Sequence, residues 1–181
     1  MALGNRRDVG EREKKLIKIH KLRTILLLEP DFNHMNKLLG KISMLNAGAN
    51  GLLAKEQYGS RKDHNSQDQS LNKRLTYDVV RQKRVRCGMC SNDAKGCYDR
   101  ITHISAGLAL TRAGAPPSAV NSMLGTIQQL KHYIRTAYGV SELFFDAKDK
   151  ENPVNGILQG NGAGLATWAL VSTPIFDSLR K

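Results

Sequence analysis

The sequence is short of the features that mark membrane, secreted and disulfide-rich proteins. Its 181 residues contain no run of about 18 apolar residues, the length that a membrane-spanning helix requires. Residues 1–8 lack the apolar core of a secretory leader. The three cysteines are an odd number, which favours reduced thiols over a disulfide framework. These absences predict an intracellular protein, nuclear or cytoplasmic, with no membrane partner.

Two common nucleotide-binding fingerprints are also absent. The phosphate loop Gly-x-x-x-x-Gly-Lys-Ser/Thr does not occur in the sequence. The spacing Gly-x-Gly-x-x-Gly begins at Gly160 and Gly162 but is broken by Leu165. The sequence therefore gives no reason to expect a P-loop or a dinucleotide-binding unit.

Acidic residues are in the minority. The chain has 28 Lys and Arg against 16 Asp and Glu, a net charge of +12. Residues 1–90 hold 19 of the basic and 9 of the acidic side chains, a net charge of +10, so the rest of the chain is nearly neutral at +2. A basic half joined to a neutral half fits a partner with a phosphate backbone. A basic surface that is merely solvated gives the same composition.

The spacing of the apolar residues predicts an α+β fold. Two helices are expected to begin at an N-cap: one from Asp31 to about residue 46, and one from Ser66 to residue 83. Further helices are expected from Asp99 to Gly114, from Pro116 to residue 130 and over 165–179. The last of these is expected to be kinked or shortened by Pro174. Strands are expected at 22–28, 85–92, 133–138 and 141–145, the last two as a pair. The first helix is expected to turn an apolar stripe to the core: Phe32, Met35, Leu38, Leu39, Ile42 and Leu45.

The chemistry of the chain is concentrated in residues 85–100. The expected strand stops at Asp93, a Gly-containing turn follows, and an amphipathic segment opens at Asp99. A carboxylate at the end of a buried strand is costly unless a cation or a group of hydrogen-bond donors meets it. Asp93 is therefore a candidate metal ligand. On the local pattern alone, the more common reading is that Asp93 caps the turn and Asp99 caps the next helix.

A second kind of site is possible in the same stretch. Cys87, Cys90, Cys97 and His103 have the spacing C-x2-C-x6-C-x5-H, which could hold zinc through three thiolates and an imidazole. Against this, Cys87 and Cys90 would lie on opposite faces of the expected strand. Whether these four residues bind zinc is left open by the sequence.

Four segments in order resemble a reverse transcriptase of the non-LTR retrotransposon kind. The first palm motif of that family is a strand that ends in Asp with an aromatic five positions later, matched by Asp93 and Tyr98. The second is Gln-Gly before a turn of small residues and a helix, matched by Gln159 and Gly160. Two upstream segments are similar to its fingers: Leu22-Arg23-Thr24-Ile25, and Gln57-x-Gly59-x-Arg61 within residues 56–61. The resemblance covers roughly residues 20–181.

The resemblance implies part of a right-hand polymerase, with helices packed on a small antiparallel sheet. Residues 1–20 would form a basic N-terminal arm, 21–84 the fingers and their connection to the palm, and 85–181 a partial palm. The thumb and the third palm motif would be missing.

The implied activity is RNA-directed DNA synthesis by a two-metal mechanism. Asp93 would be catalytic and, with the backbone carbonyl of Ala94, would hold Mg²⁺ or Mn²⁺. Tyr98 would exclude a 2′-hydroxyl, Arg23 would bind the triphosphate, and Gln159 with Gly160 would line the pocket for the incoming base and template. The implied partners are an RNA template, a DNA primer, deoxynucleoside triphosphates and the rest of a retroelement polyprotein.

Two departures from the family pattern qualify this expectation. Leu165 stands where the family commonly has Pro, and the third palm motif, an aromatic-x-Asp-Asp hairpin, does not occur in the 181 residues. Asp177 is the only Asp after Gln159. A lone Asp93 cannot neutralise two divalent ions, so we expect a fragment or a decayed copy that does not polymerise by itself. The alternative is a non-catalytic basic domain that binds nucleic acid by charge.

Overall fold

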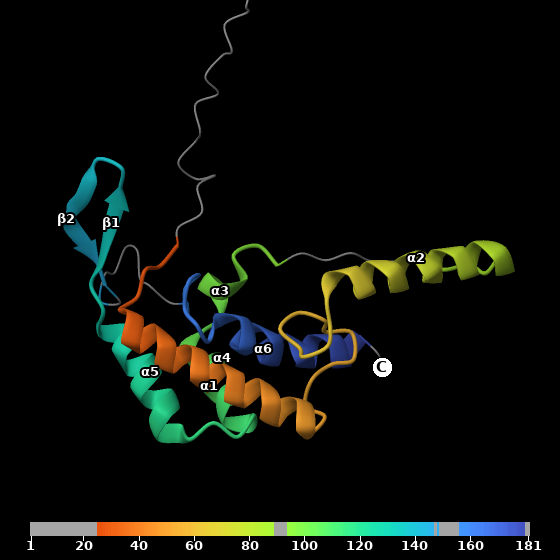
Figure 1. Ribbon diagram of the computed structural model, residues 1–181, viewed down its shortest axis with the longest axis horizontal. Coiled ribbons are helices and arrows are strands. Elements are labelled where there is room, and N and C mark those ends of the chain that lie inside the picture. The colour runs from red at the N-terminus through yellow and green to blue at the C-terminus, as the bar shows by residue number, and fades with distance from the viewer. Residues whose placement is uncertain (1–24, 89–93, 147, 149–155, 180–181) are drawn as a thin grey trace, which may run out of the picture.

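The protein has an α+β fold, shown as a computed structural model in Figure 1. The structure describes residues 25–88, 94–146, 148 and 156–179, and statements about the fold refer to these residues. Two predicted site residues, Arg23 and Asp93, lie outside the described residues, as does Cys90. The division into residues 1–20, 21–84 and 85–181 stays a prediction.

Six helices and two strands make up the described part. In chain order they are α1 (Pro30–Ala49), α2 (Ser66–Lys83), α3 (Cys97–Arg100), α4 (His103–Arg112), α5 (Pro117–Gln129), β1 (His132–Thr136), β2 (Gly139–Phe145) and α6 (Gly164–Leu179). Within this part, no helix is long and apolar enough to cross a membrane.

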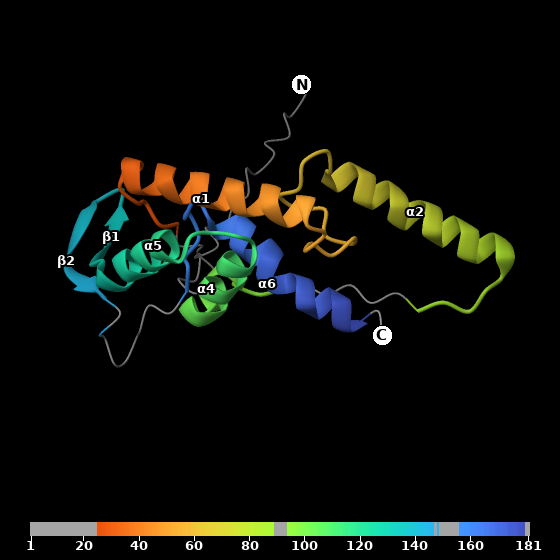
Figure 2. The ribbon, with the colours of Figure 1, turned by 90° about the horizontal axis from the view of Figure 1, so that it is seen from below.

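The body of the molecule is a helical cluster built around α6. Helix α1 packs along α6, and α4 lies between α5 and α6 (Figures 1 and 2). The fully buried apolar side chains include Leu110 of α4, Val120 and Ile127 of α5, and Ile157 of the segment before α6. The apolar spacing of residues 116–130 predicts that Val120, Met123, Leu124, Ile127 and Leu130 point inward. The first four are buried in α5, whereas Leu130 follows the last turn of the helix and is half-buried.

The interface between α1 and α6 is built from small side chains. The buried residues of α1 are Asn36, Gly40, Ser43 and Ala47. A Cβ on Gly40 would lie 3.1 Å from Cα of Ala163 and 3.2 Å from Cβ of Ala166, so the two backbones approach closely here.

The predicted core stripe of α1 is wrong for most of its members. Met35, Leu38, Ile42 and Leu45 are 39–62% exposed, whereas Phe32 and Leu39 are only partly buried at the edge of the core. The reason is that α1 turns its small face to α6, which leaves the larger apolar residues outside. The start of the helix also differs: Pro30 occupies the first turn behind Glu29, and Asp31 lies inside the helix.

The predicted strand pair is confirmed as an antiparallel hairpin of β1 and β2. His132 pairs with Phe145 and Tyr133 with Phe144, and Ala137 and Tyr138 form the connecting turn. The hairpin projects from one end of the helical body (Figure 1). The expectation of helices packed on a sheet is therefore wrong in the described part, where the helices pack on one another.

Helix α2 begins and ends where the sequence predicts, at Ser66 and Lys83. Its N-cap is Asn65, whose side chain accepts a hydrogen bond from the backbone N–H of Asp68, so the predicted cap at Ser66 is wrong by one residue. None of its residues is buried, and the helix projects from the end of the body opposite the hairpin (Figures 1 and 2).

Two other predicted strands are not found in their described parts. Residues 25–28 and 85–88 have irregular backbone, and all of residues 85–88 are exposed. A strand needs a neighbour that continues its ladder of hydrogen bonds. Leu26 finds one such bond at a turn, and a turn cannot extend a ladder.

The predicted helix from Asp99 to Gly114 is divided in two. Its first part is the single turn α3, and Thr102 caps α4 by accepting a hydrogen bond from the backbone N–H of Ser105. Of the apolar residues whose spacing predicts this helix, Ile101 and Leu110 are buried, whereas Ile104 and Leu108 are 77% and 69% exposed. Helix α6 agrees better with its predicted range of 165–179. It continues through Pro174 to Leu179, so the predicted shortening at Pro174 is wrong.

Candidate functional site

The candidate site is the turn from Leu158 to Gly164, which leads into α6. The turn needs unusual backbone conformations, with φ of 64° at Leu158 and 115° at Gly160. The N–H of Leu26 donates a hydrogen bond of 2.7 Å to the carbonyl oxygen of Gln159. This bond joins two segments that are 133 positions apart in the sequence.

Glycine is required at position 160 for two reasons. Its φ lies in the region that side chains disfavour, and a Cβ there would overlap the carbonyl oxygen of Leu26. The chain segment before α1 therefore lies directly on the backbone of the turn, with no room for a side chain between them.

Asn33 in the first turns of α1 holds the same turn from the other side. Its amide nitrogen donates to the carbonyl oxygen of Gly160 at 3.2 Å, and its amide oxygen accepts from the N–H of Gly162 at 2.7 Å. A Cβ on Gly162 would lie 2.8 Å from the backbone nitrogen of Lys37. The path of the turn is thus fixed by one side chain and by close backbone contact with α1.

Tyr98 meets the turn from α3. Its carbonyl oxygen accepts a hydrogen bond of 3.1 Å from the N–H of Ile157. Its ring lies beside the backbone of Gly164, where a Cβ would be 3.5 Å from Cδ1 of the ring. Partial burial raises the pKa of the Tyr98 hydroxyl above its ordinary value, and the nearby Cys97 thiol raises it further. The hydroxyl therefore stays protonated at neutral pH.

His103 ties α4 to the segment before the turn. Its Nε2 lies 3.2 Å from the carbonyl oxygen of Gly156, and its Nδ1 lies 2.9 Å from the side-chain amide nitrogen of Gln128 in α5. Both ring nitrogens thus face protein partners, which does not favour the zinc reading of this histidine. Cys87 is exposed and Cys97 half-buried, both as free thiols.

The structure brings three of the predicted site residues together. Tyr98 contacts Ile157 and Gly164, on either side of the turn that contains Gln159 and Gly160. Ala94 is exposed and lines a hollow of about 270 Å³ with Lys95, Cys97, Arg100, Ile101, Thr102, Ser105, Trp168 and Val171.

The metal ion implied by the resemblance is not supported by the described residues alone. Among them, no group of three or more His, Cys, Asp or Glu side chains gathers in a way that could hold an ion. The predicted metal-binding carboxylate, Asp93, and the predicted triphosphate ligand, Arg23, are not among these residues.

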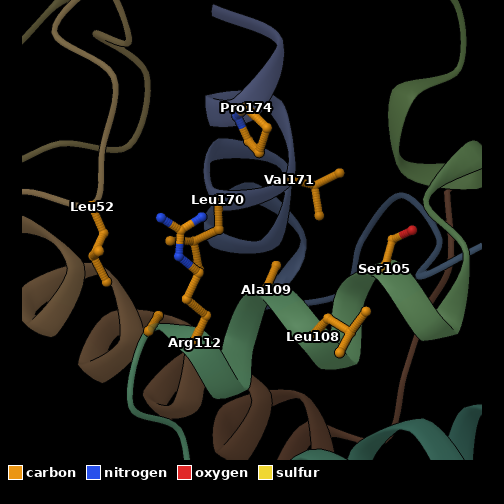
Figure 3. A pocket seen from close by; sticks show the side chains of 9 residues that line it. Leu52, Ser105, Leu108, Ala109, Arg112, Leu170, Val171 and Pro174 are labelled. Atoms are coloured by element: carbon orange, nitrogen blue, oxygen red, sulfur yellow. The ribbon is translucent and has the colours of Figure 1, made fainter. Parts of the chain in front are cut away.

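A second hollow, of about 300 Å³, lies between α4 and α6 (Figure 3). Arg112 extends from α4 toward Leu170 and is the one charged residue in a lining that is apolar except for Arg112 and Ser105. Although it is the larger of the two hollows, it contains none of the predicted site residues. We therefore attach no function to it.

The upstream segment with Gln57, Gly59 and Arg61 folds against the far end of α6. The N–H of Ala54 donates to Oγ1 of Thr173 at 3.4 Å, and the guanidinium of Arg61 donates to the carbonyl oxygens of Ala54 and Gln57 at 3.1 and 3.5 Å. This Arg therefore holds its own loop together and lies away from the turn at Gly160.

Sequence reasoning missed Leu26, Asn33 and the pair formed by His103 and Gln128. Leu26 acts through its backbone, which no sequence pattern reveals. Asn33 is a polar residue in the first turns of a helix, and no sequence pattern indicated that it contacts a residue 127 positions away. The glycines at 160 and 162 were the only available signal, because they indicate close backbone approach without naming the partner.

Comparisons with protein-family models, with curated proteins and with solved structures found no match to this chain.

Proposed function

We propose that the chain is the fingers and part of the palm of an RNA-directed DNA polymerase of the retroelement kind. The observation that carries the proposal is the meeting of three separate motif segments at one turn. The expected fingers strand, 22–28, reaches it through Leu26, the residue after the fingers motif; the first palm motif reaches it through Tyr98, and the second palm motif is the turn itself. A chance match of short motifs gives no reason for them to converge.

The roles in this proposal follow from the chemistry of each residue. Tyr98 is a half-buried neutral phenol, whose ring would stand against the sugar of an incoming deoxynucleotide. Gln159 is half-exposed and Gly160 exposed, so a base pair would lie against the side of the turn that Leu26 and Asn33 do not cover. A divalent ion, which stabilises charge on phosphoryl oxygens, would be held by Asp93 and the carbonyl of Ala94.

Binding of Mn²⁺ together with a deoxynucleoside triphosphate tests the proposal in the chain as it exists. We expect the protein to lower the free Mn²⁺ signal in electron paramagnetic resonance further than the same concentration of dGTP does alone. The Asp93→Asn variant should weaken this binding about tenfold or more, because it removes the ligand charge. Asp99→Asn, six positions on at an exposed site, is the matched control and should bind as the wild type does.

Sugar discrimination tests Tyr98 separately. The wild type should bind Mn²⁺–dGTP more tightly than Mn²⁺–GTP, because the ring would collide with a 2′-hydroxyl. Tyr98→Ala should bring the ratio of the two dissociation constants close to one, whereas Tyr98→Phe should preserve it. Equal binding of both nucleotides by the wild type would remove Tyr98 from the proposed role.

Turnover needs the carboxylate pair that the sequence does not contain. A chain continued through an Asp-Asp hairpin should extend a DNA primer on an RNA template in Mg²⁺, and Asp93→Asn should abolish the extension. If neither chain binds nucleotide but both bind RNA, the alternative holds: a basic, non-catalytic nucleic-acid-binding domain, which the net charge of +12 favours.

A further inference from the structure

The outer face of the hairpin combines two aromatic rings with two cations. Tyr133 of β1 and Phe144 of β2 are cross-strand partners, with ring centroids 5.9 Å apart. The ammonium of Lys131 lies 4.6 Å from the centroid of the Phe144 ring. Arg135 follows Tyr133 by two positions on β1, across a shift in the strand register, and adds a second exposed cation to the hairpin.

These side chains are open to solvent. Tyr133 is 51% and Phe144 43% exposed, and Lys131 and Arg135 are also exposed. A free hairpin gains little from two large rings on its outer face unless they contact something else. His132 and Phe145, which form the next cross-strand pair, are half-buried, so Tyr133 and Phe144 lie farther from the helical body in a more open part of the hairpin.

We propose that this face, formed by Lys131, Tyr133, Arg135 and Phe144, binds single-stranded RNA. Exposed aromatic rings on a β-surface stack unpaired bases, and flanking cations contact the phosphates between them. The order Lys131, Tyr133, Arg135, from the residue before β1 into the strand, places a cation on either side of an aromatic ring, as phosphates flank a base along a nucleic-acid strand. Glu142 of β2 is the one acidic side chain on the two strands.

The choice of RNA rests on the proposed function, in which the chain copies an RNA template. In the sequence, β2 ends at Phe145, 14 positions before Gln159 of the candidate turn. A template held on the hairpin would therefore lie on the same stretch of chain as Gln159.

The test measures binding of a labelled 12-nucleotide oligouridine to the full chain by fluorescence anisotropy, with EDTA present and no nucleotide. Tyr133→Leu keeps an apolar, strand-compatible side chain but removes the ring. We expect it to weaken binding roughly 5- to 150-fold, the range found for loss of one base-stacking ring. Tyr133→Phe should bind as the wild type does.

Tyr77→Ala is the matched control, because Tyr77 on α2 has the same exposed fraction, 51%, as Tyr133. It should leave the affinity unchanged. The cations are tested through the salt dependence: Lys131→Gln and Arg135→Gln should each reduce the slope of log affinity against log salt by about 0.7, while Lys73→Gln on α2 should not.

A second readout reports stacking directly. In the Tyr133→Trp variant, oligouridine should quench the additional indole fluorescence in a saturable way, over the background of Trp168. Absence of quenching, or wild-type affinity in Tyr133→Leu, would overturn the proposal. The proposal would also be overturned if the wild type bound no RNA but formed a dimer that Tyr133→Leu abolishes, because this face would then bind a second copy of the chain.

The nucleic acid itself is varied in the last arm. Oligouridine should bind more tightly than the deoxy strand of the same sequence and than a duplex RNA of equal length. Equal affinity for the deoxy strand would overturn the assignment to RNA. Because metal and triphosphate are left out, this test can fail while Asp93-dependent nucleotide binding succeeds, and the reverse can also occur.

Discussion

Helix α1 and helix α2 are similar in length and strength of sequence signal, but they have opposite environments. Helix α1 has a buried face of small residues that lies against α6, and its Asn33 reaches the candidate turn. Helix α2 has an N-cap, a regular apolar stripe and basic residues in its last turn, yet none of its residues is buried. The comparison shows that local signals define where a helix begins and ends, while packing is decided by fit to a distant partner.

Glycine substitutions should give the largest contrast between the two regions. Gly160→Ala forces a side chain into a disfavoured φ and into the carbonyl of Leu26, so we expect a loss of about 4 kcal/mol or more in the free energy of unfolding. Gly59→Ala, in the loop before α2, meets nothing within 4 Å and should change it by less than about 0.5 kcal/mol. Urea denaturation followed by circular dichroism measures both.

Replacing a leucine by alanine should give the second-largest difference in the free energy of unfolding between the helical body and α2. Leu110→Ala opens a cavity in the core between α4 and its neighbours and should cost about 2–5 kcal/mol. Leu75→Ala on α2 removes a side chain that is 52% exposed, and alanine favours helix, so the change should stay within about 0.5 kcal/mol. A large loss in Leu75→Ala would mean that α2 is covered in solution.

Asparagine substitutions should show the smallest of the three contrasts. Asn33→Ala leaves the carbonyl of Gly160 and the N–H of Gly162 without their partner, at a cost of about 1–3 kcal/mol. Asn72→Ala on α2 removes one exposed hydrogen bond to the Tyr58 hydroxyl and should cost less than about 0.5 kcal/mol. Hydrogen exchange at Gly162 offers a local measurement, since it should accelerate only in Asn33→Ala.

The parts of the fold that the sequence predicted are those set by nearby residues. The bounds of α2, the pairing of 133–138 with 141–145 and the inward face of α5 all follow from local spacing and turn residues. The break between α3 and α4 was also readable in principle, because Thr102 and Ser105 have the spacing of a helix cap.

The rest depended on contacts across the chain. Apolar periodicity indicated the wrong face of α1, since Gly40 and Ser43 are buried only because α6 presents small residues opposite them. In the candidate site, the meeting of Tyr98 with the Gln159 turn follows from the motif order, but Leu26 and Asn33 could not be foreseen. Their contacts join positions more than 120 residues apart.

The pairing of α1 with α6 also governs how the chain is made. A ribosome that has finished Ala49 must add about 115 more residues before Gly164 emerges, which takes roughly 6–23 s at ordinary rates of synthesis. During that interval the nascent α1 lacks both of its packing partners, which are α6 and the turn that contains Gly160 and Gly162. Chaperones that bind nascent chains are thus expected to contact residues 30–49 first, and to release them only after α6 has been synthesised.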